Sequence, residues 1–265
     1  MRSNFRHMAT IGIFDSGLGG LSVLTAAARL LPREKYIYFA DSAFCPYGEK
    51  TPGFIRERCR TITRTLLEKG AEIIVVACNT ATGAAISDLR AEYPQIRFIG
   101  MEPAVKPAAL GTRSGVIGVL ATAGTLKASK YLKTKGDWED NCTICEHVGK
   151  GFVELVESGR TEGPEAEETV RASLQPLLSR GADTIVLGCT HYPFLLDVMK
   201  KVSPEGIRFI DPAPAVARQL LKVMDSEGIG HGPVNEGGSP ERPAVELLSS
   251  GDTESLRKMF DRIEF

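Results

Sequence analysis

The amino-acid sequence predicts an α/β fold with two similar lobes, each a mostly parallel sheet flanked by helices, and an active site in the cleft between them. Strand patterns alternate with helix patterns along most of the 265 residues, which is typical of parallel sheets covered by helices. Two strand-like segments, 73–80 and 184–191, each carry an apolar run, a cysteine and then hydrogen-bonding residues. Because sites in open α/β sheets lie beyond the carboxyl ends of the strands, each segment is expected to deliver one thiol to that edge.

The first series of elements runs to about residue 100. Short apolar runs predict strands at Thr10–Phe14, Tyr36–Ala40, Glu72–Ala77 and Arg97–Gly100. Between them, the patterns predict helices at Leu21–Leu31, Gly53–Lys69 and Thr80–Ala91. Pro52 suits the start of the second helix, because its missing N–H would have no partner there.

A similar series of elements then begins again. Its strands are expected at Ser114–Leu120, Thr143–His147, Asp183–Leu187 and Ile207–Ile210. Its helices are expected at Gly124–Thr134, Gly151–Gly159, Glu165–Arg180 and Phe194–Lys201. The segment Ile11–Phe14 resembles Ile117–Leu120, and a nearly equal offset separates Cys78 from Cys189. These offsets predict two similar lobes facing each other.

The C-terminal part of the chain carries fewer signals. A helix is predicted at Ala213–Met224, followed by a loop rich in glycine and proline at Gly228–Pro243. A strand at Ala244–Leu248 and a helix at Thr253–Ile263 complete the prediction.

The bulk composition excludes several classes of protein. With 43% hydrophobic and 25% charged residues, it is that of an ordinary globular protein. A formal net charge of -1 gives no positive field for nucleic acid or an anionic membrane. No apolar stretch approaches the roughly 20 residues of a membrane span, and residues 1–7 do not resemble a signal peptide. We therefore expect a cytoplasmic protein whose six cysteines are free thiols.

Two loops that follow predicted strands carry polar groups. In the first, Asp15 and Ser16 precede a glycine-rich turn over residues 17–20, whose backbone N–H groups can hold an anion. Its spacing differs from the dinucleotide fingerprint, and a tight turn with Asp15 as a helix cap is an equally good interpretation. In the second loop, Asp41 and Tyr47 offer a carboxylate and a hydroxyl, although the segment alone is more typical of a surface turn.

Cys78 and Cys189 carry the strongest chemical signal. A structural cysteine needs no polar neighbours, whereas hydrogen-bonding groups follow both of these at a strand-to-helix junction. The start of the following helix favours a thiolate, and His191 could tune the Cys189 thiol or protonate a substrate group. One thiolate can remove a proton from a carbon while the opposite thiol returns one to the other face, which inverts the stereocentre. Hydroxyl donors suited to stabilising the carbanion are those of Ser16, Thr80 and Thr190.

Other candidate groups give weaker signals. Cys142 and Cys145 with His147 invite a zinc or redox interpretation, but no second ligand pair stands at zinc spacing. Glu154 and Glu157 share one helical face, which by itself indicates only a solvated helix surface. Nothing in the chain demands a pyridoxal, nicotinamide or metal cofactor.

Four motifs together resemble bacterial glutamate racemase, in the order and at the spacing of that family, over residues 10–220. The motifs are Asp15–Val23, Pro46–Thr51, Ala77–Thr82 and Gly188–Pro193. One segment departs from the family pattern, since Ala-Asp-Ser-Ala-Phe at 40–44 replaces the more usual Gly-Asp-Thr-Ala-Arg type of sequence. This departure leaves the role of Asp41 open.

The resemblance implies a cofactor-independent racemase that interconverts L- and D-glutamate and supplies D-glutamate for peptidoglycan. It implies that residues 1–101 and 212–265 form the first lobe and residues 102–211 the second. Members of the family commonly form homodimers. The segment Met101–Pro107 resembles a stretch found in some members, which leaves open whether a cell-wall precursor activates the enzyme.

The resemblance also implies roles for single residues. By motif match, Cys78 and Cys189 are the two acid–base residues, with Asp15 and His191 as auxiliary groups and Glu157 as a further acidic residue. The expected substrate contacts are Asp15, Ser16, Pro46, Tyr47, Gly48, Asn79, Thr80, Thr190 and His191. In the family, the first of the two cysteines deprotonates D-glutamate and the second deprotonates L-glutamate.

Three alternatives remain open at the level of sequence. A related two-thiol enzyme could act on aspartate, a hydantoin or maleate, because selection for side-chain length depends on the shape of the cleft. A thiol redox protein would use Cys142 and Cys145. A second role as an inhibitor of DNA gyrase, which some glutamate racemases have, gains no support from the near-neutral net charge.

Overall fold

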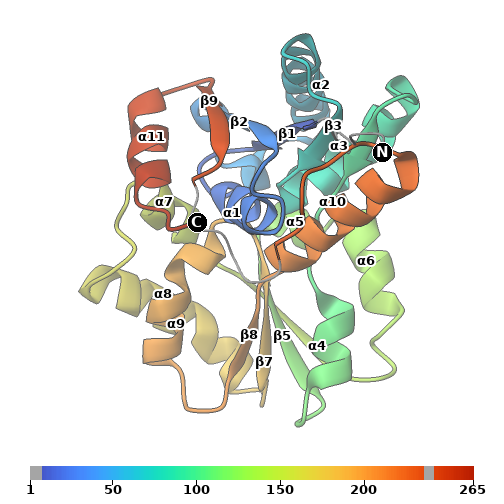
Figure 1. Ribbon diagram of the computed structural model, residues 1–265. Helices are drawn as coiled ribbons and strands as arrows, with labels where there is room; N and C mark the ends of the chain where they lie inside the picture. Colours follow the sequence, from blue (N-terminus) through green and yellow to red (C-terminus); the bar gives the residue numbers. More distant parts are fainter. Residues whose placement is uncertain (1–7, 236–241) are drawn as a thin grey trace.

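The computed structural model describes residues 8–235 and 242–265. The chain forms two sheets of parallel strands, one above the other in Figure 1, with helices on both faces of each, which confirms the predicted fold class. Residues 1–7, on which the signal-peptide prediction rests, and residues 236–241 of the predicted loop lie outside the described residues. Within the described segments, every helix is too short or too polar to span a membrane.

The first sheet has five strands in the order β4-β3-β1-β2-β9. These strands are β1 (Thr10–Asp15), β2 (Lys35–Ala40), β3 (Ile73–Val76), β4 (Arg97–Ile99) and β9 (Ala244–Ser249). One face packs against α1 (Leu21–Leu30), α10 (Ala213–Glu227) and α11 (Thr253–Asp261). The other face packs against α2 (Pro52–Glu68) and α3 (Asn79–Glu92). Alternate residues of β1 supply the two faces, with Ile11 and Ile13 in the first core and Phe14 in the second.

The second sheet has four strands in the order β6-β5-β7-β8. These strands are β5 (Val116–Ala121), β6 (Thr143–Val148), β7 (Thr184–Gly188) and β8 (Arg208–Ile210). One face packs against α7 (Phe152–Glu157), α8 (Pro164–Leu178) and α9 (Leu196–Val202). The other face packs against α4 (Val105–Gly111) and α6 (Ser129–Gly136). Strands β3 and β7, which precede the two cysteines, are buried along their whole length, as their apolar runs predicted.

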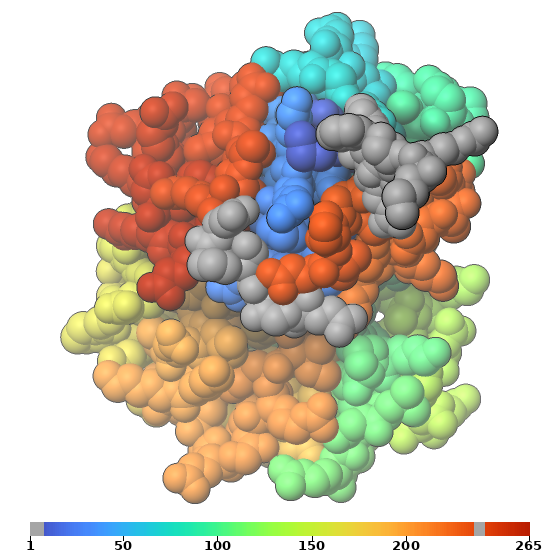
Figure 2. Space-filling view, viewed as in Figure 1, coloured from blue at the N-terminus to red at the C-terminus, as the bar shows by residue number. Residues whose placement is uncertain are grey.

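The C-terminal segment returns to the first sheet. Strand β9 pairs in parallel with β2, and Figure 2 shows this red segment beside the blue N-terminal part of the chain. The Asp252 side chain caps α11 by accepting the backbone N–H groups of Glu254 and Ser255. Leu256 and Phe260 of α11 then pack into the core that β1 and α1 share.

Helical boundaries differ from the prediction in the second half of the chain. The helix predicted at Gly124–Thr134 is two short helices, α5 (Ala123–Leu126) and α6, because Ala128 between them has an extended backbone. The helix predicted at Phe194–Lys201 begins as a 3-10 turn, η3 (Tyr192–Leu195), before α9. Helix α4 has no counterpart in the prediction, since its seven residues include a proline and a glycine, both weak helix formers.

Candidate active site

Segments that follow β1, β2, β3, β5, β6 and β7 meet in a pocket between the two sheets. Its cavity measures only about 10 Å³, so the walls lie close around the side chains that face it. The lining residues are Ser16, Pro46, Tyr47, Gly48, Cys78, Asn79, Thr80, Thr122, Val153, Gly188, Cys189, Thr190 and His191. All four sequence motifs therefore reach one pocket, and both sheets contribute to its wall. A larger cavity of about 290 Å³ lies beyond Glu157 against α11, and neither Cys78 nor Cys189 lines it.

Cys78 lies between β3 and α3, at the N-cap of the helix. Its extended backbone lets Sγ accept a hydrogen bond from the Ala81 N–H at 3.4 Å, while the thiol lies 3.9 Å from the Ser16 hydroxyl. Burial and the nearby Asp15 carboxylate raise the pKa of Cys78 well above its ordinary value of 9.0. These two effects outweigh the hydrogen bond from the Ala81 N–H at the start of α3, which favours the thiolate.

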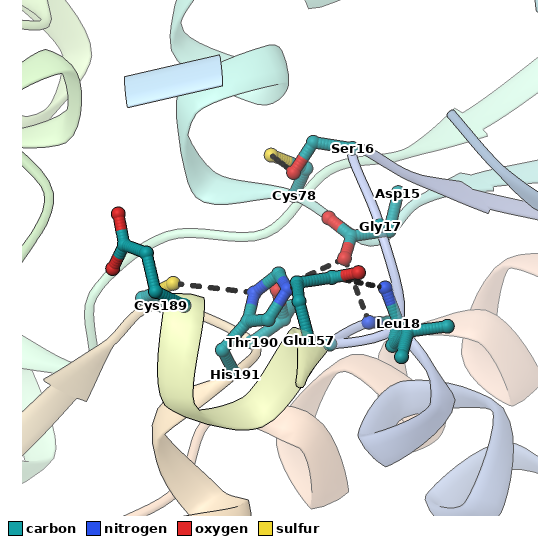
Figure 3. Close-up of polar contacts among 12 residues, drawn as sticks. Asp15, Ser16, Gly17, Leu18, Cys78, Glu157, Cys189, Thr190 and His191 are labelled. Atoms are coloured by element: carbon teal, nitrogen blue, oxygen red, sulfur yellow. Dashed lines mark hydrogen bonds and ion pairs between the residues drawn. The ribbon is translucent and has the colours of Figure 1, made fainter. Parts of the chain in front are cut away.

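Cys189 lies beside an imidazole that is itself paired. Its Sγ is 3.7 Å from Nδ1 of His191, and Nε2 of the same ring is 2.6 Å from Oε1 of Glu157 (Figure 3). Burial lowers the pKa of His191, but contacts with Cys189, Cys45 and Glu157 outweigh it and raise the pKa well above 6.5. For Glu157, burial favours the neutral acid, yet hydrogen bonds from His191 and the Leu18 N–H lower its pKa. An imidazolium–carboxylate pair therefore faces the second thiol.

Asp15 ends β1 and is fully buried. Its Oδ2 accepts the Gly20 N–H at 2.8 Å and the Thr190 hydroxyl at 3.3 Å, so the carboxyl group joins the glycine-rich turn to the segment after β7. Burial raises the pKa of Asp15, and the nearby His191 opposes that shift only in part. Oδ1 has no hydrogen-bond partner among the described residues. Asp15 is therefore not the cap of α1, whose N-cap is Gly20 and has no side-chain capping hydrogen bond; the carboxyl group instead holds the N–H of that N-cap residue.

Asn79 and Thr80 begin α3 and lie directly after Cys78. Asn79 is 5% exposed, and neither polar atom of its side chain has a hydrogen-bond partner in the described part of the chain. Since buried polar groups are rarely left unpaired, this amide is available to a ligand. The Thr80 hydroxyl, by contrast, lies 2.9 Å from that of Thr122 and 3.2 Å from that of Thr125, which links α3 to the second sheet.

The proline-containing loop forms two 3-10 turns, η1 (Ser42–Phe44) and η2 (Tyr47–Glu49). Tyr47 is buried and lines the pocket, but its hydroxyl donates to Asp41. Asp41 is itself fully buried and also pairs with Arg58 of α2. The interpretation of this loop as a surface turn is therefore wrong.

Several residues at the site were not singled out from the sequence. Thr122 follows β5, the counterpart of β1 in the internal similarity, and this position could have indicated it. Cys45 lies against His191 and Glu157. The ligand atoms of these three side chains lie within 4.8 Å of one another, so they form a group that could hold a metal ion.

Cys142 and Cys145 stand apart from this site. Cys142 packs in the core under α4 and α6, and its thiol lies 3.8 Å from the Trp138 carbonyl oxygen. Cys145, on β6, packs in the core on the opposite face of the sheet. The two thiols therefore point into different cores, which is unfavourable for the zinc or redox interpretation.

Comparison with protein families places this geometry in context. The model of the Asp/Glu/Hydantoin racemase family matches residues 21–220. A glutamate racemase from Ectopseudomonas mendocina is 49% identical over 216 residues, which is 82% of each chain. Another from Pseudomonas putida is 45% identical over 252 residues, covering 95% of this chain and 92% of that one.

Solved structures of glutamate racemases are also similar to this chain. The Escherichia coli glutamate racemase in complex with L-glutamate and the activator UDP-MurNAc-Ala superposes with a TM-score of 0.83 at 33% identity, covering 98% of this chain and 96% of that one. The glutamate racemase isoform RacE1 from Bacillus anthracis gives a TM-score of 0.82 at 29% identity, covering 97% and 94% of the two chains.

Proposed function

Because the chain belongs to the glutamate racemases of the Asp/Glu/Hydantoin racemase family, we propose that it interconverts L- and D-glutamate with Cys78 and Cys189 as its two acid–base residues. One observation carries the proposal. The two thiols follow strands of different sheets and line one closed pocket, with separate polar partners for each. A substrate Cα held between them has one sulfur on each face.

The proposed reaction moves one proton on and one proton off Cα. With D-glutamate, the Cys78 thiolate takes the Cα proton and becomes a thiol, leaving a carbanion. The Cys189 thiol then gives its proton to the opposite face and becomes a thiolate, which completes L-glutamate. L-glutamate reacts by the reverse sequence, so the two sulfurs exchange roles.

Each thiol needs a group that helps it to ionise when substrate is bound. For Cys189 that group is the His191–Glu157 pair, whose imidazolium stabilises a neighbouring thiolate. For Cys78 it is Asp15, whose raised pKa suits a carboxyl group that exchanges a proton inside the site.

The substrate's own charges need polar partners in the same pocket. The unpartnered Asn79 amide and the free Oδ1 of Asp15 are the groups available for them. The Ser16 hydroxyl and the backbone at Gly48 complete the proposed contacts and stabilise the developing carbanion, whereas the Thr190 hydroxyl already donates to Asp15.

The wider assignments belong to the same proposal. The complex of the Escherichia coli relative supports glutamate as substrate and UDP-MurNAc-Ala as a candidate activator. We also propose a homodimer, cytoplasmic location and a supply of D-glutamate to peptidoglycan. The membership of β9 in the first sheet supports lobe boundaries at 1–101 with 212–265 and at 102–211.

Chiral analysis of the product tests this function. The protein is incubated with L-glutamate and, separately, with L-aspartate, without added cofactor and with or without UDP-MurNAc-Ala. We expect D-glutamate to form and aspartate to be a poor substrate. Cys78→Ser and Cys189→Ser should each lower racemisation by about 10³-fold or more, since each removes one acid–base group. Preferred turnover of aspartate, or near-normal racemisation by either variant, would contradict the proposal.

A further inference from the structure

A buried ion pair lies behind the loop that forms one wall of the pocket. Asp41 is fully buried between β2 and η1. Its Oδ2 accepts hydrogen bonds from the Tyr47 hydroxyl and from Nε of Arg58 at 2.9 Å, and its Oδ1 accepts one from Nη2 of Arg58 at 2.7 Å. The guanidinium group therefore holds both oxygens of the carboxylate in the two-point geometry that arginine provides.

Arg58 comes from α2, outside the motifs that predicted the site. Its guanidinium carbon lies 4.2 Å from the centre of the Phe44 ring, and Phe44 packs edge-on against Phe54 at 5.6 Å. Position 44 is one of three at which residues 40–44 depart from the Gly-Asp-Thr-Ala-Arg type of sequence, and a phenylalanine stands there in place of the arginine. The cation that compensates Asp41 therefore comes from a neighbouring helix, and its guanidinium stacks on the Phe44 ring.

The ion pair connects to the pocket through Tyr47. The Tyr47 ring and the adjacent Gly48 both line the cavity that contains the two cysteines. A Cβ added to Gly48 would lie 3.0 Å from the Thr122 side chain, so the loop also packs closely against the second sheet. A shift of Tyr47 would therefore move the pocket wall and its contact with the opposite lobe.

We propose that Arg58 is a positioning residue for substrate binding, which holds the Pro46–Gly48 wall in place through Asp41 and Tyr47. The inference rests on the proposed function for its kinetic readout. Without the guanidinium, the buried Asp41 carboxylate has no cation beside it, and the loop must move or admit water to solvate it. Removing the carboxylate as well relieves that demand, because an asparagine at 41 can still accept the Tyr47 hydroxyl.

A double-mutant cycle tests the pair. We expect Arg58→Met to raise the KM for glutamate about tenfold or more with a smaller change in kcat, and Arg58→Lys to recover part of this loss. Asp41→Asn combined with Arg58→Met should bind glutamate better than Arg58→Met alone by about fivefold. A merely structural role predicts fewer active molecules, hence a lower kcat with unchanged KM, and that result would overturn the proposal.

The matched control is Arg60→Met on the same helix, because Arg60 pairs with Glu92 at 2.6 Å on the protein surface. A second readout needs no turnover: the rate at which iodoacetamide alkylates Cys78, followed by peptide mass spectrometry. Arg58→Met should speed this alkylation about fivefold or more relative to wild type, whereas Arg60→Met should leave it within twofold. Equal alkylation rates in all three proteins would overturn the proposal, whether or not the wild type racemises glutamate. Failure of the wild type to racemise glutamate would instead refute the proposed function.

Discussion

At the residue scale, the two thiols differ in their surroundings. Cys78 lies beside the Ser16 hydroxyl, the Ala81 N–H and the Asp15 carboxyl group, whereas Cys189 faces the His191–Glu157 pair. Because L- and D-glutamate have equal free energies, kcat/KM must be the same in both directions whatever the surroundings. The asymmetry of the site can therefore appear in kcat and KM taken separately, and in the pH dependence of stability.

The His191–Glu157 pair predicts a pH-dependent stability. His191 has a raised pKa, so its stabilising contribution is fully present below about 6.5 and is lost as the pH rises through the folded-state pKa. Glu157 has a lowered pKa, so its contribution is present above about 4.5 and is lost as the pH falls through that lowered value. Urea unfolding of wild type and Glu157→Gln should differ by about 1–2 kcal/mol near pH 6, and the difference should shrink in alkaline solution. A difference that grows with pH would contradict the assigned charges.

The Asn79 side chain is expected to contribute to glutamate binding but not to the stability of the fold. Its side chain makes no hydrogen bond among the described residues, so its loss removes no internal hydrogen bond. We expect Asn79→Ala to raise the KM for glutamate about tenfold or more, as for a lost hydrogen bond to a charged group of about 1.5–3 kcal/mol. Thermal unfolding should change little. An unchanged KM with a large fall in Tm would mean that the amide serves the fold.

At the element scale, strands are easier to predict from this sequence than contacts between elements. Strands β3 and β7 were recognised because buried apolar runs end in polar residues, and the carboxyl-edge rule then placed Cys78 and Cys189 correctly. The break between α5 and α6 was missed because an extended Ala128 leaves no local sequence signal. The approach of Arg58 to Asp41 depends on how α2 packs over η1, which no pattern within either segment contains.

The active site leaves no space for a side chain at Gly19 in the glycine-rich turn. A Cβ built on Gly19 would lie 2.3 Å from Nδ1 of His191, too close for either group to stay in place. We expect Gly19→Ala to lower racemase activity about 10²-fold or more and to destabilise the fold by about 1–3 kcal/mol. Gly53→Ala on α2 is the control, because a Cβ there meets nothing within 4 Å and both properties should be kept. Activity assays and urea titrations of the two variants decide the matter, and near-normal activity of Gly19→Ala would refute the steric argument.

At the scale of the whole molecule, the internal similarity explains why two thiols meet in one pocket. Two parallel sheets with the same topology around their central strands each deliver one thiol to a shared pocket. The cavity of about 10 Å³ has room for about one water molecule, so we expect the pocket to widen when it takes up a substrate. Contacts such as that between the Thr80 and Thr122 hydroxyls link the two lobes beside the pocket. The sequence predicted the two lobes but not these contacts, which depend on how the lobes face each other.

In the proposed reaction, each face of the substrate has its own thiol. The most direct measurement follows hydrogen at Cα when wild-type protein converts L-glutamate in D₂O, at early conversion. The two-thiol reaction predicts that the D-glutamate formed carries deuterium, because its new Cα hydrogen comes from the opposite, solvent-exchanged thiol, while the remaining L-glutamate keeps its protium. Protium carried over into the product, or deuterium accumulating in unconverted L-glutamate, would show that a single base serves both faces and would contradict the two-thiol reaction.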